Sequence, residues 1–187
     1  GRAEFPIPPR TQKHSVGGPG ERASPEHREQ APPTQAKQRT QVVELELFTC
    51  RFTALVEEMG SLLQRTALSV NVKERFDFSC ALLDANGSLV ANAPHIPVHL
   101  GALGVCVREL RRHVAVSRGD VIVTNHPGYG GSHLPDVTLV APVHATDGSL
   151  LGYIANRAHH AEIGGVQPGS MSPHARCLVE EGVVLAP

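Results

Sequence analysis

The stretch Val137-Thr-Leu-Val-Ala-Pro-Val143 is followed by Asp147-Gly148 and then by Leu150-Leu-Gly-Tyr-Ile-Ala-Asn156. Both apolar runs have the length and the residue types of strands. An Asp-Gly pair supplies the backbone conformations that a tight turn between antiparallel strands requires. The sequence therefore predicts a β-hairpin over residues 137–156, preceded by a further strand over residues 120–125.

Two more strands and two helices are expected upstream. Residues 76–93 contain two strand-like runs joined at Asp84-Ala-Asn-Gly87, where Asn-Gly favours a tight hairpin turn. Apolar residues recur at three- and four-residue steps from Leu45, which predicts an amphipathic helix of about 20 residues. The same period returns over residues 98–114. We expect an α+β fold, with a mixed sheet, hairpins and two amphipathic helices.

The first 40 residues differ in composition from the rest. They contain 7 of the 15 prolines and too few apolar residues for any helical or strand period. We expect residues 1–40 to be a disordered, Pro-rich leader and residues 41–187 to form the folded unit. The apolar stretch that ends at Pro187 resembles a strand.

Composition excludes several classes of function. The formal net charge of −1 and an aromatic content of 4% disfavour nucleic-acid and membrane-surface binding. The chain has no apolar run long enough to span a bilayer and no secretory signal pattern, which favours the cytosol. No Gly-rich loop followed by Lys is present to bind ATP. Without any C-x-x-C pair, the cysteines are expected to be buried free thiols: Cys50, Cys80, Cys106 and Cys177.

Histidines gather in one part of the chain, since 8 of the 11 lie between His95 and His160. His133 and Asp136 precede the first strand of the 137–156 hairpin, and His159 and His160 follow the second. Pairing of these strands would bring His133, Asp136 and one of the two adjacent histidines together. Two imidazoles and a carboxylate suit Mn²⁺, Fe²⁺ or Zn²⁺, although such histidines also serve as ordinary hydrogen-bonding residues. Because His159 and His160 should point to opposite faces, only one of them is expected to be a ligand.

Longer motifs in the same region are similar to those of a known family. In this order along the chain they are Leu63-Gln-Arg-Thr-Ala67, Lys73-Glu-Arg-Phe-Asp-Phe-Ser-Cys-Ala-Leu82, Asn92-Ala-Pro-His-Ile-Pro-Val-His-Leu-Gly-Ala102, Asn125-His-Pro127, Gly130-Gly-Ser-His-Leu-Pro-Asp136, His159-His-Ala-Glu-Ile-Gly-Gly165 and Pro168-Gly-Ser-Met171. With these motifs the chain resembles the hydantoinase B/5-oxoprolinase family. His126, where many relatives have Asp, favours the oxoprolinase branch.

The resemblance implies a division of labour between two parts of an enzyme. ATP and Mg²⁺ would act in a separate hydantoinase A-like subunit or domain, which phosphorylates an amide or lactam oxygen. The B-like part would complete ring opening, with 5-oxo-L-proline converted to L-glutamate in glutathione metabolism. The full enzyme is expected to be a homo-oligomer that acts on 5-oxoproline or a related cyclic amide.

The resemblance also assigns site residues. Related acetone carboxylases bind a metal through a His-x-x-Asp pair and a later His, which implies His133, Asp136 and His159 here. Glu162 is the acid/base candidate, or else a solvent-facing carboxylate. Four further histidines remain candidates for the site: His95, His99, His126 and His160.

The matched motifs correspond to the N-terminal piece of a B-like domain. We therefore expect an incomplete hydantoinase B-like domain that needs further parts for activity. Two alternatives are a non-catalytic truncated fragment or interaction module, and a hydantoinase or carboxylase subunit of the same family.

Overall fold

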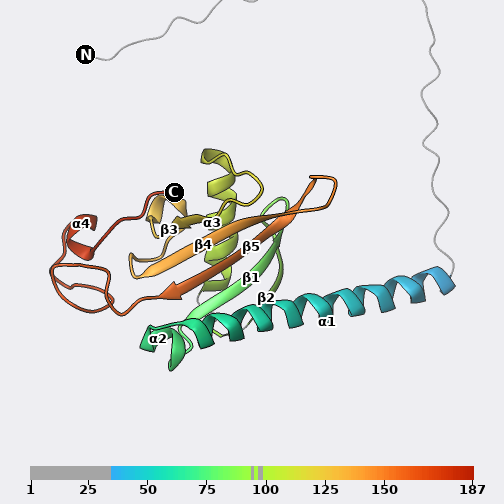
Figure 1. Cartoon of the computed structure of the whole chain (residues 1–187), viewed down its shortest axis with the longest axis horizontal. Helices are drawn as coiled ribbons and strands as arrows, with labels where there is room; N and C mark the ends of the chain where they lie inside the picture. The colour runs from blue at the N-terminus through green and yellow to red at the C-terminus, as the bar shows by residue number, and fades with distance from the viewer. Residues whose placement is uncertain (1–34, 94, 97–98) are drawn as a thin grey trace, which may run out of the picture.

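The computed structural model describes residues 35–93, 95–96 and 99–187, and its centre is a five-stranded antiparallel sheet (Figure 1). The strands are ordered β2-β1-β5-β4-β3 across the sheet. Their bounds are β1 Phe78–Asp84, β2 Leu89–Ala93, β3 Ile122–Thr124, β4 Asp136–His144 and β5 Leu150–His159. The mixed α+β fold and both predicted hairpins are confirmed.

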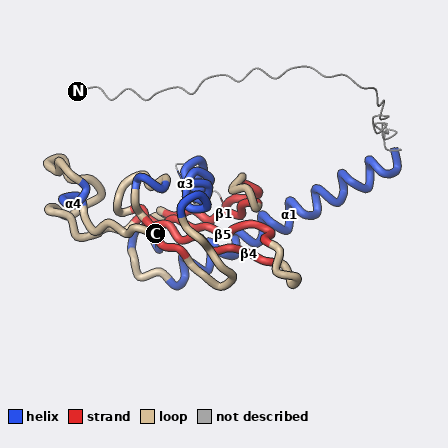
Figure 2. The backbone as a smooth tube through the Cα atoms, turned by 90° about the horizontal axis from the view of Figure 1, so that it is seen from above, coloured by secondary structure: helices blue, strands red, loops and turns tan. Residues whose placement is uncertain are grey.

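Helices cover both faces of the sheet (Figure 2). The long helix α1 (Gln35–Thr66) packs on one face and α3 (Leu100–His113) on the other, and the short helices are α2 (Val70–Lys73) and α4 (Leu178–Glu181). Alternation along the strands divides the core accordingly: Phe78 and Cys80 pack toward α1, whereas Ala81 and Leu83 pack toward α3. No helix in the described ranges has the length and apolar character needed to cross a bilayer.

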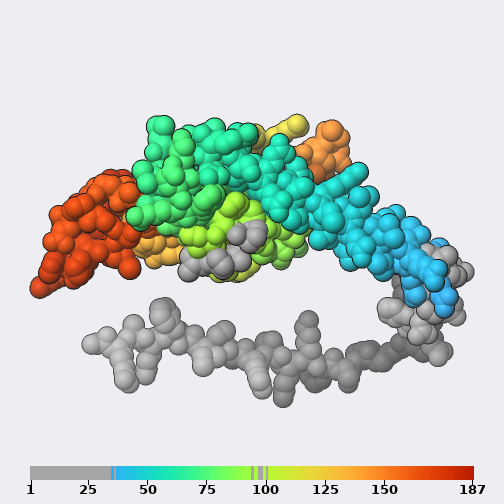
Figure 3. All heavy atoms as spheres, turned by 90° about the horizontal axis from the view of Figure 1, so that it is seen from below, coloured from blue at the N-terminus to red at the C-terminus, as the bar shows by residue number. Residues whose placement is uncertain are grey.

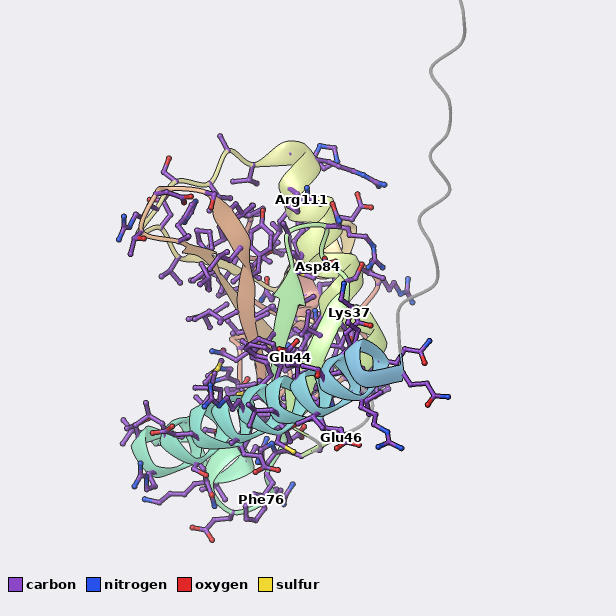
Figure 4. All side chains as sticks on the ribbon, turned by 90° about the vertical axis from the view of Figure 1, so that its right-hand side faces the viewer. Lys37, Glu44, Glu46, Phe76, Asp84 and Arg111 are labelled. Atoms are coloured by element: carbon purple, nitrogen blue, oxygen red, sulfur yellow. The ribbon has the colours of Figure 1, made fainter. Side chains whose placement is uncertain are left out.

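Helix α1 begins ten residues before the predicted start at Leu45. It includes residues 35–40, which we assigned to the leader, while residues 1–34 lie outside the described part. Residues 35–44 have no apolar period, and this end of the helix extends away from the rest of the described chain, as Figure 3 shows at its blue end. Gln, Lys, Arg and Glu are good helix formers, so this segment is helical without burying a face. In Figure 4, Lys37, Glu44 and Glu46 mark this exposed half.

The β1–β2 turn shows why the Asp-Ala-Asn-Gly sequence makes a hairpin. Asp84 Oδ1 accepts hydrogen bonds from the backbone N–H groups of Asn86 (2.8 Å) and Ser88 (2.7 Å). Gly87 adopts a φ of +79°, which other residues rarely take. The bond from Ser88 is the largest influence that lowers the pKa of the Asp84 carboxyl, which Figure 4 shows on the side of the molecule toward Arg111.

Two sequence expectations about the core and the chain end are wrong. Cys80 and Cys106 are buried free thiols as predicted, but Cys50 and Cys177 are exposed, because the first lies on the outer side of α1 and the second in a loop before α4. The segment after α4 is not a strand. Instead, the backbone of Leu185 bonds to residues at the end of β3, where its carbonyl accepts from Thr124 Oγ1 (2.8 Å).

Candidate metal centre

The face of the sheet that packs on α3 changes from apolar to polar toward one end. Val140 and Ala155 are cross-strand partners in the apolar core. The next pair on this face is Thr138 and Arg157, and the last is Asp136 and His159. All four polar residues of these two pairs are buried. The β4–β5 hairpin therefore ends in two buried pairs of polar residues, next to the apolar core.

A buried carboxylate is the centre of this polar end. Asp136 is 1% exposed, and its two oxygens face different imidazoles. His133 Nδ1 lies 3.1 Å from Oδ2, and His159 Nδ1 lies 2.9 Å from Oδ1. The rings of His133 and His159 stack at 4.9 Å between centroids. One ligand atom from each of the three residues lies within 4.8 Å of the others, so the three could hold one metal ion.

A third imidazole approaches the same carboxylate. His99, the residue before α3, is 2% exposed, and its Nε2 lies 3.5 Å from Asp136 Oδ2. Its Nδ1 lies 3.2 Å from the hydroxyl of Ser79, which in turn donates to the carbonyl of Ile96. His99 was only one of several further candidates in the sequence, and the structure places it beside Asp136.

The histidines keep Asp136 ionised in spite of its burial. Burial raises the pKa of the Asp136 carboxyl, but the hydrogen bonds with His133, His99 and His159 together lower it well below its usual range. The bond with Asp136 is also the main reason why the pKa of His133 is raised. The site thus presents a full negative charge surrounded by imidazole nitrogens.

The Gly-rich loop before β4 packs against α3 at Gly130. Gly130 has a φ of +79°, and a Cβ there would lie 2.7 Å from the backbone N of Cys106 on α3. Just before it, the turn η2 (Pro127–Tyr129) is capped by His126, whose Nδ1 accepts from the N–H of Gly128 at 2.9 Å. Only a residue without a side chain fits Gly130, which explains the glycine at this point of the loop.

Arg157 anchors this loop by hydrogen bonds from its guanidinium group. Its side chain is fully buried, and Nε donates to Thr138 Oγ1 at 2.7 Å. The two terminal nitrogens donate to Ser132 Oγ (3.1 Å) and to the carbonyl of Gly130 (2.9 Å). Burial lowers the pKa of Arg157. The side chain nonetheless stays a cation, because the guanidinium group is strongly basic. Arg157 therefore holds the residues just before His133 in place.

Asn125, which precedes the same loop, connects it to the C-terminal segment by hydrogen bonds of its side-chain amide. Its side-chain nitrogen donates to the carbonyls of Leu134 (2.9 Å) and Val183 (2.8 Å), and its oxygen accepts from the N–H of Leu185 (2.7 Å). Both protons of this buried amide and its carbonyl oxygen are therefore paired. Residues about 60 positions apart are thereby joined at the site.

The other predicted site residues lie elsewhere. His160 is adjacent to His159 but lines a different pocket, on the α1 face, together with Glu162, which is exposed. His95 stacks on Phe78 at 4.4 Å, also on that side. His126 caps η2 as described above. Of the candidates in the sequence, the structure thus gathers His133, Asp136, His159 and His99.

The gathered residues form one wall of a pocket of about 580 Å³, which the side chains of Ile96, Ser170 and Met171 also line. The spacing within the group fits a metal. Ligands on adjacent octahedral positions, with metal bonds of about 2.1 Å, lie about 3 Å apart. The separations of 2.9 and 3.1 Å run from the two histidines to different oxygens of Asp136 and are those of hydrogen bonds, while one ligand atom from each residue lies within 4.8 Å of the others, near enough to converge on one ion.

Sequence reasoning missed the residues that support this group. No role is predicted for Arg157 or Ser170 from the sequence. Arg157 is two residues before His159 in the same strand, so strand alternation would have placed both on the same face of the sheet. Ser170 follows Gly169 in a stretch without regular structure, so no periodicity indicates where its side chain lies.

Comparisons with known proteins agree with this fold. The Hydantoinase B/oxoprolinase family model matches residues 41–187. "5-oxoprolinase 1" of Arabidopsis thaliana is 53% identical over 146 residues, which are 77% of this chain and 12% of that protein. The "5-oxoprolinase" of Saccharomyces cerevisiae is 49% identical over 143 residues, or 75% of this chain and 11% of that protein. A Pseudomonas protein named as one of the subunits of a D-/L-hydantoinase is 37% identical, covering 60% of this chain and 20% of that protein.

Two solved structures share the fold. An acetone carboxylase aligns with a TM-score of 0.73 at 20% identity, covering 81% of this chain and 20% of that one. The ATP-dependent caprolactamase of Pseudomonas jessenii aligns with a TM-score of 0.66 at 27% identity, covering 78% of this chain and 25% of that one. The chain therefore spans about an eighth of the 5-oxoprolinases and a quarter or less of these structures. Since the family model covers most of its length, the chain belongs to the Hydantoinase B/oxoprolinase family.

Proposed function

We propose that this chain contributes the metal-binding part of a B-like unit in an ATP-dependent amidohydrolase that opens 5-oxo-L-proline to L-glutamate. The observation that carries the proposal is the buried Asp136 held between His133 and His159 at a pocket, in a chain about half identical to 5-oxoprolinases. The lower identity to a hydantoinase component favours 5-oxoproline over hydantoin as substrate. ATP and Mg²⁺ would act in a hydantoinase A-like partner.

His133, Asp136 and His159 would hold one divalent ion, either Mn²⁺, Zn²⁺ or Fe²⁺. When bound, such an ion supplies Lewis acidity for a carbonyl or lowers the pKa of a water molecule. His133 has a quarter of its side chain exposed, so it faces the pocket, whereas Asp136 is enclosed. The carboxylate offsets the charge of the ion, and the two imidazoles leave open positions toward the pocket.

The overall reaction requires two separate steps. The A-like partner transfers the γ-phosphoryl group of ATP to the lactam oxygen, which makes the ring carbon electrophilic. Water then adds at that carbon, the C–N bond breaks with the nitrogen taking a proton, and phosphate leaves. The pocket beside His133 and Asp136 is where we place the hydrolytic step, and Ile96 and Met171 offer apolar contacts to the ring.

A chimera tests this function. Residues 41–187 would replace the matching segment of the Saccharomyces cerevisiae 5-oxoprolinase, and glutamate release from 5-oxo-L-proline would be measured with and without ATP. We expect an active chimera that loses at least about 100-fold in kcat with His133→Ala and keeps its activity with His160→Ala. A folded chimera that is inactive on 5-oxo-L-proline, or active only on hydantoin, would exclude the proposed substrate. Equal activity of the two variants would exclude the role of the site.

A further inference from the structure

Both ring nitrogens of His159 have hydrogen-bonding partners. Nδ1 lies 2.9 Å from Asp136 Oδ1, and Nε2 lies 2.8 Å from Ser170 Oγ. In the part of the chain that the structure describes, Ser170 is the only hydrogen-bond partner of Nε2. His133 contacts the same ring by stacking and leaves Nε2 to the serine. The orientation of the His159 ring is therefore set at one edge by a carboxylate and at the other by a hydroxyl.

The two partners of His159 differ in the tautomers with which they can pair. A neutral imidazole carries one proton, on either Nδ1 or Nε2. The Asp136 carboxylate can only accept, so it favours a proton on Nδ1. A metal ion at Nδ1 requires a lone pair there, which moves the proton to Nε2. The Ser170 hydroxyl can accept that proton's hydrogen bond, because a hydroxyl both donates and accepts. Ser170 thus keeps Nε2 paired whichever nitrogen carries the proton.

The backbone before Ser170 is built to present this hydroxyl. Gly169 has a φ of +115°, in the region that residues with a side chain rarely adopt. No atom lies within 4 Å of the position that a Cβ would take there. The glycine is therefore required by the backbone conformation and not by crowding. That conformation turns the segment back toward the end of β5, where Ser170 meets a ring 11 residues earlier in the chain.

We propose that Ser170 is a positioning residue for His159: its hydroxyl accepts a hydrogen bond from Nε2–H when Nδ1 binds the metal ion, and it thereby fixes the orientation of the ring toward that ion. The proposal rests on the proposed function, since it presumes a metal at His133, Asp136 and His159. Metal-ligating histidines commonly donate their second nitrogen to such a partner, and losing that partner typically weakens metal binding about 10- to 100-fold.

The test is Zn²⁺ affinity of the full chain, measured by competition with a chromophoric chelator. We expect Ser170→Ala to weaken Zn²⁺ binding by about tenfold or more, and Ser170→Thr, which keeps the hydroxyl, to stay within about threefold of the parent. Ser172→Ala is the matched control, because the Ser172 hydroxyl lies in the same loop and is buried without a hydrogen-bond partner among the described residues. Circular dichroism would show that each variant folds like the parent.

A second measurement reports the tautomer itself. Nitrogen-15 NMR of the Zn²⁺-loaded parent should show His159 protonated at Nε2 and bound through Nδ1. Zinc bound through Nε2 would overturn the proposal, as would a Ser170→Ala variant with unchanged affinity. Failure of the parent chain to bind Zn²⁺ at His133 and His159 would instead remove the proposed metal centre, and this inference with it. Zn²⁺ binding by the parent protein therefore distinguishes failure of the metal centre from failure of the role of Ser170.

Discussion

Asp136 and His159 are cross-strand partners at the open end of the β4–β5 hairpin, with 2.9 Å between Oδ1 and Nδ1. Asp136 is the first residue of β4 and His159 the last of β5, so one register fixes both. A shift of one residue would turn His160 toward Asp136 and His159 toward α1. The identity of the histidine at the site is therefore a property of the sheet register.

This register leads to a prediction about metal content. His133→Ala should remove stoichiometric metal from the folded protein, because it deletes one of the three proposed ligands, whereas His160→Ala should keep it, because His160 lines the pocket on the α1 face. Elemental analysis after dialysis would measure the ion, with circular dichroism as the control for folding. Loss of metal from His160→Ala together with retention in His159→Ala would contradict the strand-face assignment.

Arg157 should matter for stability more than any exposed arginine. Arg157→Met removes three hydrogen bonds and leaves the partners Thr138, Ser132 and Gly130 without their donor. We expect a loss of about 3 kcal/mol in the free energy of unfolding, measured with urea. Arg112→Met is the control: its side chain is 66% exposed and pairs with Glu109 on the helix surface, so a change within about 0.5 kcal/mol is expected. Equal effects of the two substitutions would show that Arg157 does not hold the loop.

The buried thiol of Cys80 should make the folded protein less stable at alkaline pH. Burial raises the pKa of its thiol from 9.0 to about 11 in the folded protein. The folded state therefore retains a proton that the unfolded state loses, so stability is full below pH 9 and falls as the pH rises from 9 to about 11. The thiol accounts for a decrease of about 2 to 3 kcal/mol over this window. Urea unfolding across the window should show a steeper decline for the parent than for Cys80→Ala, and parallel curves would refute the assignment.

Gly130 and Gly148 allow the cost of backbone strain to be distinguished from the cost of a steric clash. Both have positive φ values, +79° and +88°, but only a Cβ on Gly130 would collide with another segment, the backbone of Cys106. Gly148→Ala should cost about 1 kcal/mol of stability from backbone strain alone. Gly130→Ala should cost about 3 kcal/mol or more, because α3 and the loop must move apart. If thermal or urea unfolding gives equal losses, the contact between the loop and α3 contributes nothing.

Much of the fold could be predicted because its signals are local. The Asn86-Gly87 and Asp147-Gly148 turns identify the two hairpins, and the parity of His159 and His160 follows from strand alternation. The predicted hairpin register was sufficient to bring His133, Asp136 and His159 together. The start of α1 was missed because helix propensity without an apolar period gives no pattern to detect.

The contacts of the site that could not be predicted, including the one that His99 makes, join segments far apart in the chain. His99 meets Asp136 only because of where the first turn of α3 lies over the sheet, and spacing along the sequence does not contain that information. Ser170 reaches His159 through an irregular segment shaped by Gly169. Such contacts are set by packing in three dimensions and not by local residue preferences.

The bonds between Asn125 and residues 183–185 also have a consequence for synthesis. A ribosome makes the chain from its N-terminus, so Asn125 emerges long before Val183 and Leu185 exist. A nascent chain that has reached residue 180 already contains the hairpin, the histidines and Ser170, yet the amide of Asn125 still lacks two of its three partners. The last two hydrogen bonds of the Asn125 side chain can therefore form only after residues 183–185 have been made, later than the residues of the sheet that they border.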